Sequence, residues 1–254
     1  MITVLIWARR IIRTAVGGIL MMPSVTSATP QIDVGDWYEF MPPSRATLTK
    51  TVSNGGDSTA YVTVRAEEVS ASNGYAPVPE SGKTGLSVAD NLAMGLVASP
   101  SRLIIPPGMR QTVRLLVGGA RSHERYFRVS FIPVIPSEKN SFGLSDRQIL
   151  EASSGAKAGV AVLTGYGIMV TVAPDRPRYQ TRVQRTPQAW TVTNDGNATV
   201  RLLSPKVCKA DQCRYESNMH IRPGSSLTFK ADGGSSYSFR LKEGERETAQ
   251  RLTP

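Results

Sequence analysis

Two stretches of the sequence share the pattern that decides the fold: TVSNGGDSTA at residues 51–60 and TVTNDGNATV at residues 191–200. Each has an alternating segment, a turn that contains Asn and Gly, and the start of a second segment, as in a β-hairpin. Downstream, IPPG at 105–108 precedes an alternating segment at Thr112, and IRPG at 221–224 precedes one at Thr228. Because both motifs recur in the same order, the sequence predicts two copies of one β-sandwich.

The rest of the chain after residue 29 also has the two-residue period of strands. Residues 61–66 and 112–117 alternate between turn-forming clusters, and the one short helix that we expect covers residues 146–152. The segment APDRP at 173–177 ends a long β run with two prolines, which cannot donate to a ladder. We therefore predict an all-β fold of two immunoglobulin-like sandwich domains at an angle, 29–174 and 175–254, with a hinge near Pro174.

The N-terminal residues are typical of an export signal. Arg9, Arg10 and Arg13 precede or open a short apolar run at 15–22, and small residues lead to Ala28. The run is too short to span a bilayer, so we expect a signal peptide at 1–28, cleaved near Ala28, and an exported chain. The formal charge of +10 then falls to about +7, and the remaining basic residues are scattered among acidic ones. This distribution predicts a solvated surface and no nucleic-acid partner.

The two cysteines, Cys208 and Cys213, lie five residues apart. In an oxidising compartment they are expected to close a local disulfide. A zinc site would need further ligands, and His123 and His220, the two histidines, are not at ligand spacing from the pair. We expect no metal and no cofactor.

An uncharged stretch, GVAVLTGYGIMVTVAP at 159–174, follows a long polar segment at 136–158. Val160, Val162, Tyr166 and Ile168 share one parity of this stretch. Such a strand is either an ordinary core strand or an apolar edge strand with an intended β partner. Its place after the polar segment and before the hinge favours the edge strand.

Three further segments carry a family resemblance. LVASPSRLIIPPG at 96–108, followed by TVRL at 112–115, resembles a conserved region of the periplasmic chaperones of chaperone–usher pili, and ERYFRVSFIP at 124–133 resembles their F1 strand. IDVGD at 32–36 and the hairpin at Asn54 are most similar to the alternate branch, that of the common pilus and CFA/I-type fimbriae. The local cysteine pair late in the second domain is similar as well.

The resemblance implies a function for the uncharged stretch. In that family the chaperone works in the periplasm, where it lends its G1 strand to an incomplete pilin. It then delivers the pilin to an usher in the outer membrane. Here G1 would be about 159–173, and Val160, Val162, Tyr166 and Ile168 would be the donor side chains of this donor-strand complementation. The partners implied are pilins and the usher, and the G1 edge also permits self-association.

The sequence departs from the main branch of the family at the carboxylate anchor. That branch holds the C-terminal carboxylate of the subunit with an Arg in strand A1 and a Lys late in G1. Residues 31–44 contain no basic residue, and Met169 stands about where the Lys would be. The candidate anchors are Arg128 and Arg65; both are equally well interpreted as surface or interdomain salt-bridge residues.

Two other classes of function are weighed against the chaperone. A two-domain immunoglobulin-like pilus subunit or adhesin would be expected to lack its own last strand and to carry an N-terminal donor extension. A remote alternative is a serine penicillin-recognising enzyme, since Ser154 and Lys157 form S-x-x-K and residues 83–85 read K-T-G. Their order along the chain is reversed relative to those enzymes, so we do not expect an enzyme.

Overall fold

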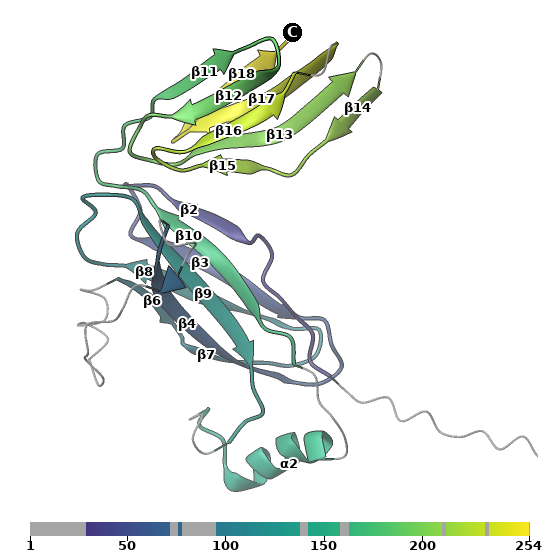
Figure 1. Cartoon of the computed structure of the whole chain (residues 1–254). Helices are drawn as coiled ribbons and strands as arrows, with labels where there is room; N and C mark the ends of the chain where they lie inside the picture. The colour runs from purple at the N-terminus through teal and green to yellow at the C-terminus, as the bar shows by residue number, and fades with distance from the viewer. Residues whose placement is uncertain are drawn as a thin grey trace, which may run out of the picture.

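The computed structural model describes residues 29–71, 76–77, 95–137, 142–157, 163–209, 212–231 and 234–253. The predicted signal peptide and the positions Val160 and Val162 lie outside these ranges. Strands form two stacks of sheets joined by a short connection (Figure 1). Among the described residues, no helix is long and apolar enough to cross a membrane.

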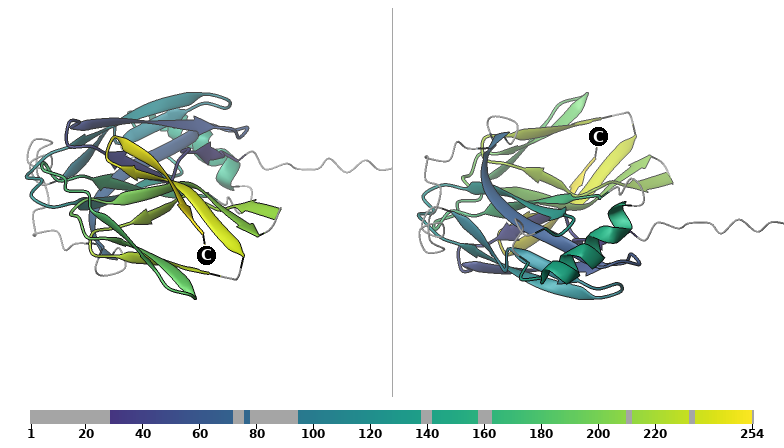
Figure 2. Two further views of the ribbon diagram at one scale, coloured as in Figure 1. Left: turned by 90° about the horizontal axis from the view of Figure 1, so that it is seen from above. Right: turned by 90° about the horizontal axis from the view of Figure 1, so that it is seen from below.

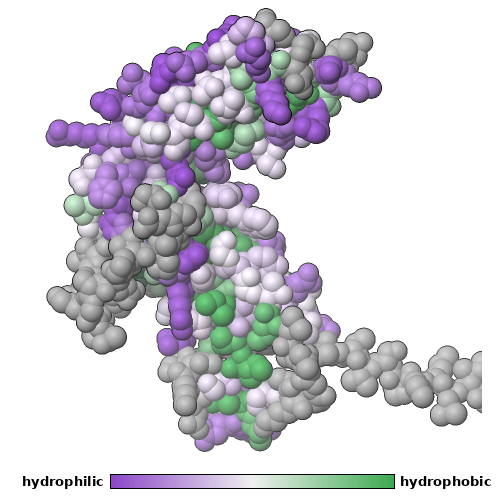
Figure 3. All heavy atoms as spheres, in the orientation of Figure 1, coloured by the Kyte–Doolittle hydropathy of each residue, from purple (hydrophilic) through white to green (hydrophobic). Residues whose placement is uncertain are grey.

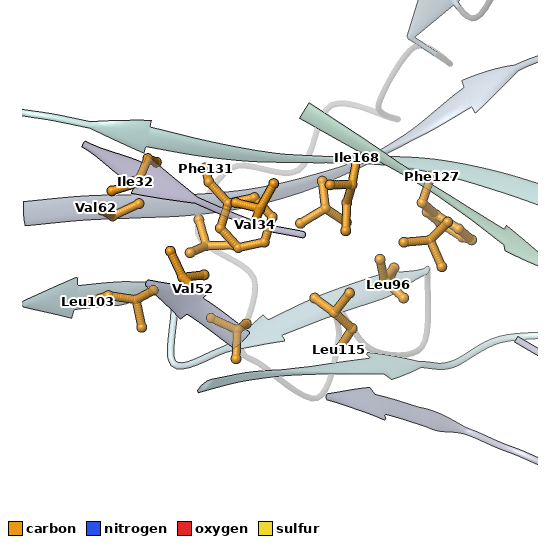
Figure 4. Packing of buried hydrophobic residues seen from close by; sticks show 14 of the residues in the cluster. Ile32, Val34, Val52, Val62, Leu96, Leu103, Leu115, Phe127, Phe131 and Ile168 are labelled. Atoms are coloured by element: carbon orange, nitrogen blue, oxygen red, sulfur yellow. The ribbon is translucent and has the colours of Figure 1, made fainter. Parts of the chain in front are cut away.

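The first sandwich consists of two sheets around one core. One sheet has the order β1 (Ile32–Asp33), β3 (Thr47–Asn54), β8 (Arg110–Val117), β6 (Leu96–Ser99). The other has the order β2 (Tyr38–Met41), β10 (Tyr166–Val172), β9 (Arg125–Pro133), β4 (Ala60–Ser70), β5 (Ala76–Pro77), and β7 (Arg102–Ile105) pairs with β4. Alternate residues of the longer strands, such as β8, β9 and β10, are buried, so the two-residue period of the sequence supplies the core that Figure 4 shows.

The second sandwich has its own core around Trp190. Its sheets have the orders β11 (Thr181–Arg185), β12 (Ala189–Asn194), β16 (Ser226–Lys230), and β14 (Gln212–Tyr215), β13 (Val200–Lys209), β17 (Ser235–Glu243), β18 (Arg246–Leu252), with β15 (Met219–Ile221) on β13. The all-β prediction of two immunoglobulin-like sandwiches is confirmed. The boundary near Pro174 stays a prediction, and it lies between the last residue of the first core, Val172, and the second core.

The repeated Asn turns have the same structure in both sandwiches. Asn54 and Asn194 are buried, and the side-chain amide of each donates to two backbone carbonyls. For Asn54 these are the carbonyls of Ser58 and Ile105. For Asn194 they are the carbonyls of Ala198 and Ile221. Each Oδ1 accepts from the N–H of a glycine two residues on, Gly56 or Gly196. The asparagine thus closes its own turn and ties it to the Pro-Gly turn, which explains why the two motifs recur together.

The predicted disulfide is present between Cys208 and Cys213, which face each other across β13 and β14. The predicted helix is also present, and longer than expected: α2 covers Asp146–Lys157. It lies at the end of the first sandwich that is remote from the second (Figures 1 and 2). The helix continues past Ala152 through Ser153, Ser154 and Gly155, which favour helix less than Ala or Lys.

Candidate functional site

The edge of β10 is covered along only part of its length. On one side, β9 pairs with all of β10, from Tyr166 to Val172. On the other side, β2 runs parallel and pairs only with Met169 to Val172. Within the described part of the chain, no strand pairs with Tyr166, Gly167 or Ile168 on this side. The sheet therefore ends in an open edge of uncharged residues.

The backbone hydrogen bonds of neighbouring residues show in which direction the N–H and C=O groups of the open edge point. The N–H of Met169 donates to the carbonyl of Trp37, and that of Ala173 donates to the carbonyl of Met41. Because backbone groups alternate in direction along a strand, the N–H and C=O of Gly167 point to the same side, beyond the end of β2. Gly167 is exposed, and a Cβ there would meet nothing closer than 4.0 Å.

The strand begins later than the sequence predicts. Its expected start was residue 159, but Leu163 to Gly165 are outside β10, and 158–162 are outside the described residues. In the register with β9, Tyr166 faces Phe131, so the partner of Thr164 would be Pro133. Proline has no N–H to donate, which explains why the ladder ends there.

Two of the four predicted donor side chains are in the described residues, and they lie differently. Tyr166 is partly buried and packs against the first core. Ile168 is completely buried in that core, between the sheets with Phe127 and Phe131 (Figure 4). In this conformation Ile168 packs within the protein itself and is not presented to a partner, because its parity faces inward.

The two predicted anchors lie together on the outer face of the same sheet. Arg128 faces Met169 across β9 and β10, and its Nε donates to Glu67 Oε1 at 2.8 Å. Arg65 is exposed on β4, opposite Ser130. Arg128 thus forms a salt bridge, as the interpretation of this residue as a surface or interdomain salt-bridge residue expects. The bridge joins two strands of one sheet and does not join the domains. Nothing in this geometry identifies a carboxylate site.

The segment that covers β10 also contacts the second domain. The ring centroid of His220 lies 4.6 Å from that of Tyr38 and 4.9 Å from that of Phe40. The guanidinium carbon of Arg201 lies 4.3 Å from the Phe40 ring centroid. Burial lowers the pKa of His220, and the charge of Arg201 lowers it further. Burial likewise lowers the pKa of Arg201.

A buried carboxylate forms the second contact between the domains. Glu124, just before β9, accepts from the backbone N–H of Thr199 at 2.6 Å and from its hydroxyl at 2.5 Å. The Tyr126 hydroxyl donates to the same carboxylate at 2.5 Å. Burial raises the pKa of Glu124, and these hydrogen bonds and the charge of Arg222 oppose that rise. Arg222 of the second domain also donates to the carbonyl of Ala71 at 2.8 Å.

Sequence reasoning missed both interdomain contacts. Tyr38 and Phe40 share one parity in WYEF at 37–40, a signal that could have suggested an amphipathic strand. Glu124 and Thr199 are 75 residues apart and belong to different sandwiches, so no local pattern connects them.

Comparison with known proteins finds sequence similarity to fimbrial chaperones. No family model matches the sequence. A protein described as "Probable fimbrial chaperone EcpB" from Escherichia coli O157:H7 (strain EC4115 / EHEC) is 28% identical over 212 residues, which are 82% of this chain and 85% of that protein. Its counterpart from Escherichia coli O1:K1 / APEC is 28% identical over 206 residues, 80% of this chain and 82% of the relative.

Solved structures share the fold at low sequence identity. A chain from the Salmonella enterica SafA pilin–SafB chaperone complex gives a TM-score of 0.52 at 14% identity, with 88% of this chain and 96% of that chain covered. The E. coli chaperone DraB gives 0.51 at 14% identity, with 89% and 98% covered. The class 5 fimbriae chaperone CfaA gives 0.50 at 16% identity, with 88% and 100% covered. The chain is thus similar to proteins described as fimbrial chaperones, in sequence over about four fifths of its length and in its two-sandwich fold.

Proposed function

We propose that the chain is a periplasmic chaperone that binds incomplete fimbrial subunits by donor-strand complementation and delivers them to an outer-membrane usher. The observation that carries the proposal is the open edge of β10. A subunit that lacks a strand needs backbone partners, and the N–H and C=O of Gly167 point away from the sheet at this edge. The relatives named as fimbrial chaperones support the same function.

The uncharged residues before β10 would supply the side chains. Val160, Val162 and Tyr166 precede the buried Ile168 with the same parity. The side chain of Ile168 is already used by the first core, so the upstream residues would enter the subunit and Ile168 would anchor the strand. Burial of each such aliphatic or aromatic side chain contributes roughly 1.5 to 3 kcal/mol.

Of the two candidate anchors for a subunit carboxylate, Arg65 is the better one. Arg128 already pairs with Glu67, whereas Arg65 forms no ion pair within the described ranges. A carboxylate would therefore meet an uncompensated cation at Arg65, and would have to displace Glu67 at Arg128.

A pilus subunit or adhesin is less well supported, because each sandwich contains its own last strand. β10 completes the first sandwich and β18 completes the second. An incomplete subunit would leave that position for a donor. Export by a signal peptide at 1–28 and passage to the usher follow from the proposed function, as does self-association through the β10 edge before a subunit arrives.

The test changes the backbone of the open edge and leaves the rest of the sheet intact. Gly167→Pro removes the N–H that points away from β9 just beyond the end of β2, and edge positions of this kind tolerate proline. Gly167→Ala is the matched control, because it keeps the N–H and its Cβ has room. Each variant is co-expressed in the periplasm with a candidate fimbrial subunit, and the amount of subunit that survives and co-purifies is measured.

We expect Gly167→Ala to retain the subunit and Gly167→Pro to lose it, with thermal unfolding of both close to that of the parent chain. Val162→Asp, which places a charge in the donor segment, is expected to lose the subunit as well. Retention of the subunit by both Gly167→Pro and Val162→Asp would refute binding through this edge. Absence of any complex with the parent chain would refute the chaperone function itself.

A further inference from the structure

One face of the second sandwich is strongly basic. In the sheet of β13, β14, β15, β17 and β18, the residues that alternate with the buried ones point away from the second core. Five of them are cationic, and we call this set the basic face: Arg201, Lys206, Arg240, Lys242 and Arg251. In the register of the sheet, Arg201 faces Lys242, and Lys206 and Arg251 lie on either side of Ser238.

The carboxylates of this sheet gather at one end. Glu247 pairs with Arg240, with 2.6 Å between Oε1 and Nη1. The charges of Glu245, in the turn between β17 and β18, and of Glu247 oppose the lowering of the pKa of Arg201 by burial. At the other end, no ion pair of Lys206 or Arg251 occurs within the residues that the structure describes. Lys206 instead lies 5.6 Å from the ring centroid of Tyr215, which is 70% exposed.

The basic face is turned towards the first domain. Arg201 belongs to it, and Arg201 contacts Phe40 on β2, the strand that covers part of β10. From this contact, β13 and β14 extend over the side of the first domain on which β2 lies (Figure 1). The space-filling view shows a hollow there between the domains (Figure 3). A molecule attached to the open edge of β10 would therefore lie on the side over which β13, the strand of Lys206, extends.

We propose that the basic face binds an acidic surface of the subunit held at β10; this inference rests on the proposed function. The five cations are spread over three strands, β13, β17 and β18, about 5 Å from one strand to the next, and alternate with serine and leucine. They form a broad, flat face and not a pocket that could enclose one phosphate group. Such a face fits a protein surface with dispersed Asp and Glu side chains, and it accelerates association by steering the partner.

The test is a charge reversal with a matched control on another face. Lys206→Glu/Arg251→Glu and Arg110→Glu/Arg114→Glu each change the net charge by about −4, since each Lys or Arg to Glu substitution changes it by −2. Arg110 and Arg114 are exposed on β8, in the sheet of the first domain that does not contain β10. The association rate of the full mature chain with a fimbrial subunit that it binds is measured at about 20 and 200 mM salt.

We expect Lys206→Glu/Arg251→Glu to slow association about tenfold at low salt and much less at high salt. The control pair should stay within about twofold of the parent chain. Equal slowing by both pairs would mean that only net charge matters, and no slowing by either would mean that the face is not used; both outcomes overturn the proposal.

Two further outcomes separate the alternatives. If the parent chain captures no subunit at all, the chaperone function fails; if every variant captures it at one rate, the basic face alone fails. Vesicles that contain phosphatidylglycerol test an anionic lipid as the partner. Loss of vesicle binding by Lys206→Glu/Arg251→Glu, with its rate of subunit capture unchanged, would assign the face to lipid and overturn the proposal.

Discussion

Replacement of Glu124 by alanine is predicted to loosen the junction of the two domains. The substitution removes the acceptor of the N–H and hydroxyl of Thr199 and of the hydroxyl of Tyr126. The two hydroxyls also hydrogen-bond to each other, so the N–H of Thr199 and one hydroxyl lose their acceptor. A buried donor without a partner costs about 1 to 3 kcal/mol. At the lower end of that range for these two donors, since water can enter the space left by the side chain, the loss of stability is about 2 kcal/mol.

Glu124→Gln is the informative control. The amide oxygen can accept from the N–H of Thr199, and the NH₂ group can donate to the two hydroxyls, because a hydroxyl both donates and accepts. The three hydrogen bonds survive, with those of the two hydroxyls reversed in direction, and the cost of burying a charge disappears. We expect a change in stability of less than about 1 kcal/mol, because the pairing is kept.

Urea unfolding followed by the fluorescence of Trp190, which is buried in the second core, measures both variants. With a urea dependence of about 1 to 3 kcal/mol/M, the alanine variant should unfold at a midpoint lower by about 0.7 to 2 M. Small-angle scattering should show a broader range of interdomain angles for it than for the glutamine variant. A midpoint of the alanine variant equal to that of the parent chain, or equal losses for alanine and glutamine, would refute the account of Glu124 as the acceptor that joins the domains.

Two other predictions concern the turns and the pH. Asn54→Ala and Asn194→Ala should each cost about 2 to 4 kcal/mol, because each leaves several buried backbone groups without a partner; proteolysis of the sandwich that carries the substitution tests this, and equal resistance to proteolysis of both sandwiches would contradict it. The pKa of His220 is lowered in the folded state, so the folded chain binds fewer protons than the unfolded one and its stability should fall as the pH drops below about 6.5. His220→Phe should reduce this loss in thermal unfolding between about pH 7.5 and 5.5, and an unchanged pH dependence would show that other groups cause it.

The sequence is sufficient to predict those features whose interactions join residues close together in the chain. The Asn turn is built from the residues of its own loop and one Pro-Gly turn, so its two copies could be recognised without coordinates. The disulfide follows in the same way from two cysteines that face each other in one hairpin.

The candidate site was predicted less completely because it depends on neighbours distant in the chain. Within the stretch 159–174, the sequence correctly indicates an apolar strand at Tyr166–Val172, but the position of Pro133 on β9 decides where pairing begins. The inward direction of Ile168 depends on the register with the same strand. The ion pair of Arg128 with Glu67 required the pairing of β4 with β9, and no spacing in the sequence encodes it.

The path of the N-terminal segment sets a limit on any strand added to β10. β1 pairs with β3 in one sheet, and after Gly35, which has a φ of +65°, the chain crosses to the other sheet and pairs with β10 as β2. An incoming strand that follows the open edge towards the hinge reaches β2 opposite Met169 and must stop there or displace it. Displacement would also break the contacts of Tyr38 and Phe40 with the second domain. The extent of β2 therefore limits how many residues of β10 an added strand can pair with.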